Sequence, residues 1–154
     1  LFNSGIRPAV NAGLSVSRVG SSAQTRAMRK VAGRMRLELA QYRALASFAQ
    51  FGSSDLDEAT KAQLDRGQLL TELMKQSQYR PQRLAHQVCS MYAAVNGYMD
   101  DVPIERISEF ETRLLGYLDT SKPELLSSIQ ERKDLDDEIE DSLKNAIIAF
   151  KATF

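Results

Sequence analysis

The sequence has very few residues of the kinds that build disulfides and zinc sites. One cysteine, Cys89, and one histidine, His86, occur among 154 residues. A single cysteine excludes an internal disulfide, so a reducing compartment is the default expectation. His86 and Cys89 lie three residues apart, but a zinc site needs at least three protein ligands and no second pair of Cys or His exists. We therefore expect ordinary helix packing or surface roles for both side chains.

Long apolar runs and an excess charge are missing as well. The longest apolar runs are a few residues, well short of the roughly 20 that span a bilayer, and no basic-then-apolar leader opens the sequence. We expect no membrane anchor in this chain. The 20 basic and 20 acidic side chains cancel, so the overall charge points neither to nucleic acid nor to an anionic membrane, although local patches remain open. The first residue, Leu1, suggests a segment cut from a longer protein.

Three motifs that carry chemistry are also absent. A nucleophile elbow requires Gly-x-Ser-x-Gly, and "GLSVS" places Ser17 where the second glycine must stand. The acidic stretch from Asp134 to Asp141 lacks the central glycine of a calcium loop, so we interpret it as a solvated helix start. No Gly-x-x-x-x-Gly-Lys-Ser/Thr occurs, which excludes a P-loop in this chain. The sequence predicts no catalytic machinery of its own.

Apolar residues recur at helical spacing over most of the sequence, and the 43% hydrophobic content is enough for one core. Caps, prolines and glycines divide the pattern into helices. We expect them to start at a Ser21–Gln24 capping box, at an Asp55–Glu58 box, after Pro81, at Pro103, at Pro123 and among Asp136–Glu138; we expect the first to end at Gly52, the second near Gln76 and the third at Gly97. Before them, Leu14–Ser17 alternates apolar and small polar residues, as a strand does. The fold class predicted is all-α, a bundle of about five to seven helices preceded by a remnant strand.

The expected first helix carries a basic face that leaves one alternative open. Cations on a helical arc can contact phosphates, or they can pair with acids inside the bundle or across an interface. Spacing alone does not decide between these roles. A freestanding helical interaction module, binding an acidic partner or nucleic acid through this face, remains the alternative function. The face comprises Arg26, Arg29, Lys30, Arg34 and Arg36.

Three stretches carry a more specific resemblance: "GIRPAVNAGLSVSRVGSSAQTRAMRKVAG", "LELAQYRALASFAQFGSSDLD" and "LMKQSQYRP". They resemble the alpha subunit of the rotary proton-translocating ATP synthase, densely through Pro81 and more loosely beyond. The closing "AIIAFKATF" is more similar to bacterial than to organellar alpha subunits. The resemblance implies that residues 1–22 are the tail end of a nucleotide-binding domain and that 23–154 are the C-terminal helical domain.

The resemblance also implies two sites. In the family, the arginine of "SVSRVGS" reaches across a subunit interface toward the gamma-phosphate on a neighbouring beta subunit, so Arg18 would be an arginine finger acting in trans. Alpha itself holds ATP or ADP with Mg that is not turned over, and its adenine would lie against Arg7, Pro8, Gln76 and Gln78. A proline ring offers an apolar plate, and glutamine amides offer donors and acceptors. No metal ligand is implied in this chain.

The partners implied are the beta subunits and the central gamma shaft, in an alternating alpha/beta hexamer. No nucleic acid is implied, and the membrane is reached only through the assembled complex. The location implied is the cytoplasmic face of the bacterial inner membrane or, alternatively, the mitochondrial matrix side. This chain alone is expected to hold no cofactor and to be inactive. Leu1–Gly20, a strand segment without its sheet, should be disordered, repacked or paired with another chain.

Overall fold

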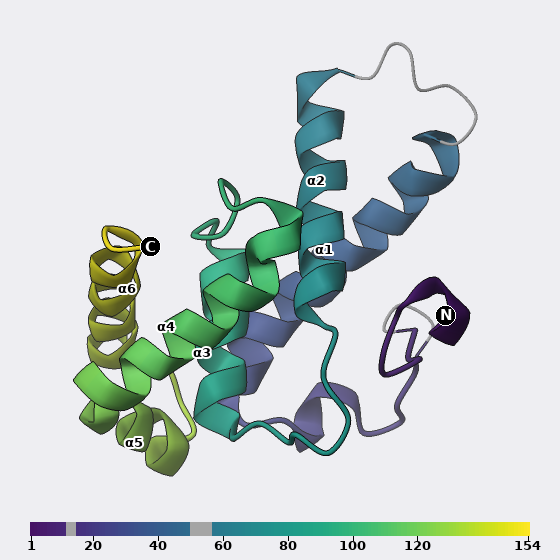
Figure 1. Ribbon diagram of the computed structural model, residues 1–154. Coiled ribbons are helices and arrows are strands. Elements are labelled where there is room, and N and C mark those ends of the chain that lie inside the picture. Colours follow the sequence, from purple (N-terminus) through teal and green to yellow (C-terminus); the bar gives the residue numbers. More distant parts are fainter. Residues whose placement is uncertain (12–14, 50–56) are drawn as a thin grey trace.

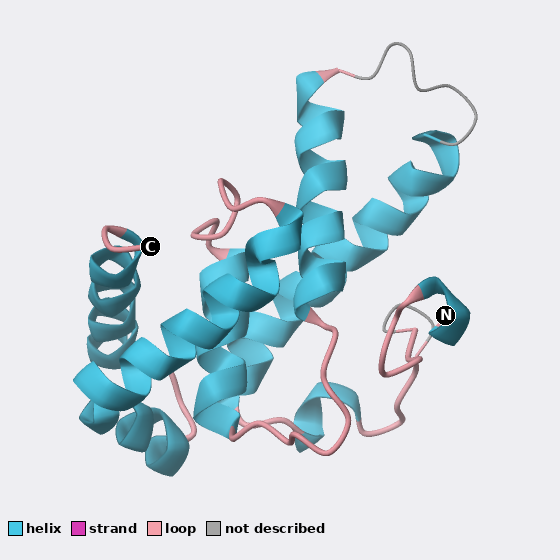
Figure 2. Cartoon of the chain, viewed as in Figure 1, coloured by secondary structure: helices cyan, strands magenta, loops and turns pink. Residues whose placement is uncertain are grey.

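The computed structural model describes residues 1–11, 15–49 and 57–154. These residues form helices joined by loops, and no strand occurs among them (Figures 1 and 2). The all-α prediction is therefore confirmed, and none of the described helices is long and apolar enough to cross a membrane. The α-helices of these ranges are α1 Arg26–Ala49, α2 Glu58–Leu73, α3 Leu84–Val95, α4 Ile107–Ser121, α5 Pro123–Arg132 and α6 Asp137–Lys151; the short 3-10 helices are η1 Phe2–Ser4, η2 Gly20–Ala23 and η3 Ile104–Arg106.

Local capping chemistry explains where several helices begin. The side chain of Asp57 accepts a hydrogen bond from the backbone N–H of Thr60 at 2.6 Å, and Asp136 accepts from Ile139 at 2.9 Å. Both satisfy backbone donors that a first helical turn leaves unpaired. Pro123 opens α5, and Gly97 follows α3 with φ 81°. Asp136, Pro123 and Gly97 match the predicted starts and stop. The N-cap of α2 is Asp57, two residues later than the predicted Asp55, which like Gly52 lies outside the described residues.

The predicted start of the first helix is wrong by several residues. Ser21 and Gln24 do not form a capping box; instead the backbone N–H of Gln24 donates to the carbonyl of Ser21 at 3.1 Å, which closes the η2 turn. The cap is Thr25, whose hydroxyl accepts from the N–H of Met28 at 3.2 Å. Two nearby hydroxyl residues offered competing caps, and the tighter turn selected the later one.

The remnant strand is not formed over Ser15–Ser17, and Leu14 lies outside the described residues. A strand needs a partner for its backbone groups, and the described residues supply none. The described N-terminal residues are mostly exposed and are held to the rest of the molecule by single hydrogen bonds. Arg36 donates to the carbonyl of Ser15 at 3.3 Å, and the N–H of Gln76 donates to the carbonyl of Arg7 at 2.9 Å.

The core is organised around α3, which packs against α1, α2, α4 and α5. Figure 1 shows α1 and α2 projecting together at one end of the molecule, with α5 and α6 at the other. At the C-terminal end the ring of Phe110 meets the rings of Phe150 and Phe154 edge to face, with centroids 5.2 and 4.9 Å apart. Helical periodicity predicted the inward residues, and most of them are buried.

The basic face of α1 is tied to other parts of the molecule. Arg26 pairs with Asp134 at 3.4 Å, and Lys30 bonds both the carboxylate of Glu140 and the carbonyl of Leu135. The Lys30 ammonium holds the pKa of Glu140 below its usual value. The other three cations of the face bond the carbonyls of Ser21 and Ser15 and the side chain of Asn96: Arg29, Arg36 and Arg34. Acids from the C-terminal part of the sequence therefore neutralise part of the face, as the balanced charge allowed.

Arg66 on α2 joins three helices through one guanidinium. Its Nε donates to Glu38 of α1 at 2.8 Å, and its Nη1 donates to Asp100 at 2.6 Å. Its Nη2 donates to the carbonyls of Ala94 and Val95, at 3.0 and 2.7 Å. These carbonyls belong to the last turn of α3, where a cation offsets the partial negative charge of the helix end.

Gly67, the next residue, sets how closely α1 approaches α2. A Cβ at this position would lie 2.1 Å from Cγ of Tyr42, far inside van der Waals contact. The Tyr42 ring therefore rests directly on the backbone of α2. Only glycine leaves room for that contact.

We predict opposite effects for alanine at two helical glycines. Gly67→Ala should lower the free energy of unfolding by about 1–3 kcal/mol, because the Tyr42 ring must move. Gly116→Ala on α4, where a Cβ meets nothing within 4 Å, should raise it by up to about 1 kcal/mol through helix propensity. Urea denaturation followed by circular dichroism measures both. Equal effects of the two substitutions would contradict the close approach of α1 and α2.

We also predict that lysine cannot replace Arg66. A single ammonium cannot serve two carboxylates and two carbonyls in the geometry of the guanidinium fork. Arg66 is 23% exposed, so Arg66→Lys should cost about 1–3 kcal/mol of unfolding free energy. The matched control, Arg132→Lys, affects an arginine that is 54% exposed and pairs with Asp136, and should cost less than about 1 kcal/mol. Thermal melts measure both variants. Equal melting temperatures would show that the guanidinium contacts of Arg66 contribute no extra stability.

Candidate functional site

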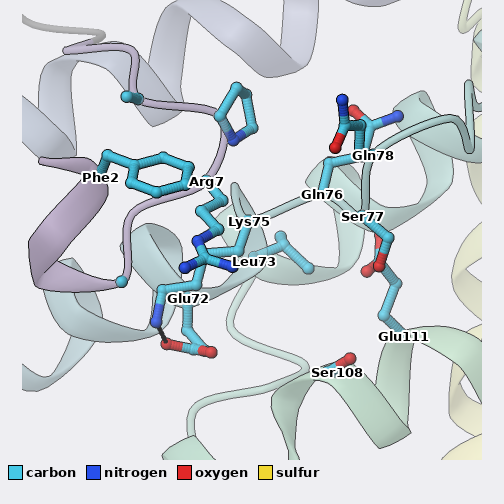
Figure 3. A pocket seen from close by; sticks show the side chains of 13 residues that line it. Phe2, Arg7, Glu72, Leu73, Lys75, Gln76, Ser77, Gln78, Ser108 and Glu111 are labelled. Atoms are coloured by element: carbon cyan, nitrogen blue, oxygen red, sulfur yellow. Dashed lines mark hydrogen bonds and ion pairs between the residues drawn. The ribbon is translucent and has the colours of Figure 1, made fainter.

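A pocket of about 870 Å³ lies between the N-terminal segment, the C-terminal end of α2 and α4 (Figure 3). All four residues predicted to bind adenine line it: Arg7, Pro8, Gln76 and Gln78. Arg7 and Pro8 precede α1 in the sequence, whereas Gln76 and Gln78 follow α2. The structure therefore brings together the two motifs, "GIRPA" and "KQSQ", that suggested the site.

The loop after α2 forms one wall. The helix ends at Leu73, and the backbone N–H of Gln76 donates to the carbonyl of Arg7 at 2.9 Å, which ties this loop to the N-terminal segment. The side-chain nitrogen of Gln76 donates to the carbonyl of Arg80 at 2.6 Å. Tyr79 has φ 61°, a left-handed conformation that is rare for a bulky residue, and its side chain is 90% exposed. The loop thus reverses tightly before Pro81.

The N-terminal segment forms the opposite wall. Gly5, at φ 79°, closes a turn in which its N–H donates to the carbonyl of Phe2 at 3.1 Å. This turn redirects the backbone so that the guanidinium carbon of Arg7 lies 4.4 Å from the centroid of the Phe2 ring. The Arg7–Pro8 peptide bond is cis. The wall consequently presents a stacked cation–aromatic pair beside a proline ring.

The third wall comes from α4 and was missed by the sequence reasoning. Ser108 and Glu111 line the pocket from this helix, and Oε1 of Glu111 accepts from Gln82 at 3.4 Å. Glu72, at the end of α2, pairs with Lys75 at 2.5 Å in the same pocket. The sequence did contain a signal for Glu111. Phe110 and Leu114 belong to the buried face of α4, and Glu111, the residue after Phe110, lies at the border of that face. Nothing in the local pattern indicated that this face would border the loop after α2.

The pocket has the chemistry of a site for a flat, polar-edged group. Proline and phenylalanine rings supply apolar surface, while Gln78 and Arg7 supply hydrogen-bond donors. No metal cluster is present in the described part of the protein, since no three His, Cys, Asp or Glu residues there are grouped to hold an ion. The sequence contains no P-loop, so these residues suit a base better than a triphosphate.

Arg18 lies apart from this pocket. It is exposed in the loop before η2 and makes no hydrogen bond or ion pair with the described residues. The hydroxyl of Ser17 accepts from the N–H of Gly20 at 3.1 Å, which shapes the turn around it. The structure thus gives two separate candidate sites: a pocket, and one outward-facing arginine.

His86 and Cys89 do not share a metal site. Cys89 is fully buried, and burial raises the pKa of its thiol to about 12, which disfavours the thiolate that a metal needs. His86 Nε2 lies 3.0 Å from Oδ1 of Asp119 on α4 and 3.0 Å from Nη2 of Arg83. Cys89 packs in the core, and His86 contacts Arg83 and Asp119 between α3 and α4.

Comparison with known proteins identifies the family. Residues 24–150 match the family described as "ATP synthase alpha/beta chain, C terminal domain". The protein is 58% identical over 151 residues to ATP synthase subunit alpha of Desulfovibrio desulfuricans, covering 98% of this chain. It is 54% identical to the same subunit of Syntrophomonas wolfei and 56% identical to that of Petrotoga mobilis, and both matches cover 100% of this chain. It spans about 30% of the length of these curated relatives. It therefore belongs to the family of C-terminal domains of the ATP synthase alpha and beta subunits, and it corresponds to the C-terminal portion of the alpha subunit.

Proposed function

We propose that this chain serves a rotary, proton-translocating ATP synthase in two ways: it binds the base of a nucleotide that is not turned over, and it lends Arg18 to the catalytic site of a neighbouring beta subunit. The observation that carries the first role is the convergence of Arg7, Pro8, Gln76 and Gln78 on one pocket. Residues 1–22 act with the nucleotide-binding domain, and 23–154 form the helical domain.

The adenine of ATP or ADP fits the chemistry of the pocket. The Pro8 ring offers an apolar plate for the base, and the amide of Gln78 can donate to a ring nitrogen. A phosphate-binding loop elsewhere in the complete subunit supplies the main handle on the nucleotide and its Mg²⁺. This chain by itself binds nucleotide weakly and hydrolyses none.

Arg18 has the properties that an arginine finger requires. Its guanidinium is permanently charged and planar, and it carries several donors, which suits the negative charge spread over a transferring phosphoryl group. Its exposure and its lack of a partner among the described residues leave it free to reach another subunit. Most cations of α1, by contrast, are bonded within the molecule.

The partners are beta subunits and the central gamma shaft in an alternating hexamer, held at the membrane by the rest of the complex on the cytoplasmic face of the bacterial inner membrane or on the mitochondrial matrix side. The alternative, a freestanding module that binds nucleic acid or an acidic partner, has less support. Its proposed surface is the basic face of α1, and each of the five cations there already bonds a group of this molecule.

Replacing Arg18 in a complete alpha subunit assembled with beta tests the catalytic role. If the guanidinium meets charge that develops mainly in the transition state, Arg18→Ala should lower ATP turnover by roughly 10³ to 10⁵ and change ground-state nucleotide affinity much less. Arg18→Lys should restore little activity, since an ammonium lacks the planar fork. Steady-state ATPase assays and nucleotide titrations measure the two effects.

Arg26→Ala is the matched control, because Arg26 is an exposed arginine whose pair with Asp134 lies on the surface. Its turnover should stay within about threefold of the parent enzyme, a change below about 1 kcal/mol. Gel filtration must show that both variants assemble. An assembled Arg18→Ala enzyme that also turns over within about threefold would make Arg18 a plain surface residue.

Replacing Gln78 in the complete alpha subunit tests the base site. Gln78→Ala removes a side-chain amide from the pocket and should weaken ADP binding about 5- to 100-fold, the range for losing a hydrogen bond in a partly closed site. Gln63→Ala, at an exposed position on α2 away from the pocket, should leave the affinity unchanged. Isothermal titration calorimetry gives both constants; identical affinities for the two variants would exclude this pocket as the base site.

A further inference from the structure

The segment around Arg18 is not held in place by apolar packing within this chain. The apolar side chains that flank Arg18, those of Val16 and Val19, are 88% and 61% exposed. Arg18 itself is exposed in the loop before η2. Side chains that point into solvent do little to fix a backbone, because they bury almost no apolar surface. Hydrogen bonds therefore set the direction in which Arg18 projects.

Two guanidinium groups of α1 bond this segment, one on each side of Arg18. Nε of Arg29 donates to the carbonyl of Ser21 at 3.1 Å, and Nη2 of Arg36 donates to the carbonyl of Ser15 at 3.3 Å. These carbonyls lie three residues after and three residues before Arg18. Arg29 and Arg36 are seven residues apart, which is almost two helical turns, so they project from the same side of α1. The segment 15–21 is therefore tied along one side of this helix.

A turn connects the carbonyl that Arg29 holds to Arg18. The hydroxyl of Ser17 accepts from the N–H of Gly20 at 3.1 Å, and this bond closes a turn around Arg18. Gly20 has φ 55°, a left-handed conformation that glycine adopts without strain. Ser21 follows Gly20 directly, so its carbonyl lies immediately after the turn. A shift of Ser21 consequently moves the turn and the guanidinium that the turn presents.

We propose that Arg29 is a positioning residue, which aims Arg18 by holding the carbonyl of Ser21. The inference rests on the proposed role of Arg18 as an arginine finger. A donor stabilises a transferring phosphoryl group best when it is already in place, and a misplacement of about 1 Å can cost about 100-fold in rate. Arg29 acts on the reaction only through the position of Arg18.

Replacing Arg29 in a complete alpha subunit assembled with beta provides the test. Arg29→Ala should lower kcat for ATP hydrolysis about 3- to 10-fold, which corresponds to one hydrogen bond, and leave KM within about twofold. Arg29→Lys should restore most of the turnover, because an ammonium can donate to a single carbonyl. Arg18→Lys should restore little, since the finger needs the planar fork. Lysine thus distinguishes the two roles.

Arg34→Ala is the matched control. Arg34 lies on the same helix, is exposed, and donates to the side chain of Asn96 at 2.9 Å, away from the segment that carries Arg18. Its removal should leave kcat within about twofold of the parent enzyme. A loss in Arg34→Ala as large as that in Arg29→Ala would show a general effect of removing a cation from α1 and would overturn the proposal.

A double variant separates positioning from a merely structural contribution. If Arg29 acts only through Arg18, Arg29→Ala should change the rate of the Arg18→Ala enzyme by less than about twofold, because no finger remains to be aimed. Single-turnover ATP hydrolysis measures these slow rates. A structural contribution would lower the rate by the same factor in both backgrounds, and that result would overturn the role of Arg29.

The outcomes are distinct from those of the test of Arg18 itself. An assembled Arg18→Ala enzyme with the turnover of the parent would remove the finger, and the positioning role of Arg29 with it. A large loss in Arg18→Ala together with parent turnover in Arg29→Ala would overturn the role of Arg29 and leave the finger standing. Gel filtration establishes that each variant has assembled before its rate is compared.

Discussion

The guanidinium of Arg66 is the contact on which the arrangement of the first three helices depends. It carries hydrogen bonds to Glu38, to Asp100 and to the last carbonyls of α3 at the same time. One planar group with five donors can do this, because its donors point in fixed and different directions. Gly67 beside it removes the Cβ that would hold Tyr42 away. Together the two residues fix the position of α2 against α1 and α3, and hence the point at which the backbone leaves α2 to form the wall of the pocket.

The pocket is built from three segments that are not adjacent in the sequence. The N-terminal segment contributes the stacked Phe2 and Arg7, the loop after α2 contributes the glutamines, and α4 contributes Glu111. The backbone bond from Gln76 to Arg7 joins the first two segments directly. Two donors of the pocket are already bonded within the molecule: the side-chain nitrogen of Gln76 to the carbonyl of Arg80, and the ammonium of Lys75 to Glu72. The donors and acceptors that stay unbonded, more than the volume, limit which ligand groups the pocket can bond.

Sequence reasoning succeeded where local chemistry decides the structure. Asp136 caps α6 because a carboxylate beside a first helical turn finds unpaired N–H groups within a few residues. Pro123 and Gly97 act through their own backbone preferences. The start of α1 was misplaced because two hydroxyl residues, Ser21 and Thr25, offer similar caps and the η2 turn took the first. The strand at Leu14–Ser17 failed over its described residues because a strand is defined by its partner, and alternation alone cannot supply one.

The sequence by itself determined the helical class, the buried faces and the absence of a P-loop, because periodicity, composition and short motifs are properties of neighbouring residues. Resemblance to a known family added Arg18 and the four residues proposed to bind a base, yet it left Phe2 and Glu111 unnoticed. Only the tertiary structure placed these two in the pocket and tied the basic face of α1 to Asp134, Leu135 and Glu140. Such contacts join residues that are far apart in the sequence, and they form only after helix packing has fixed which faces meet.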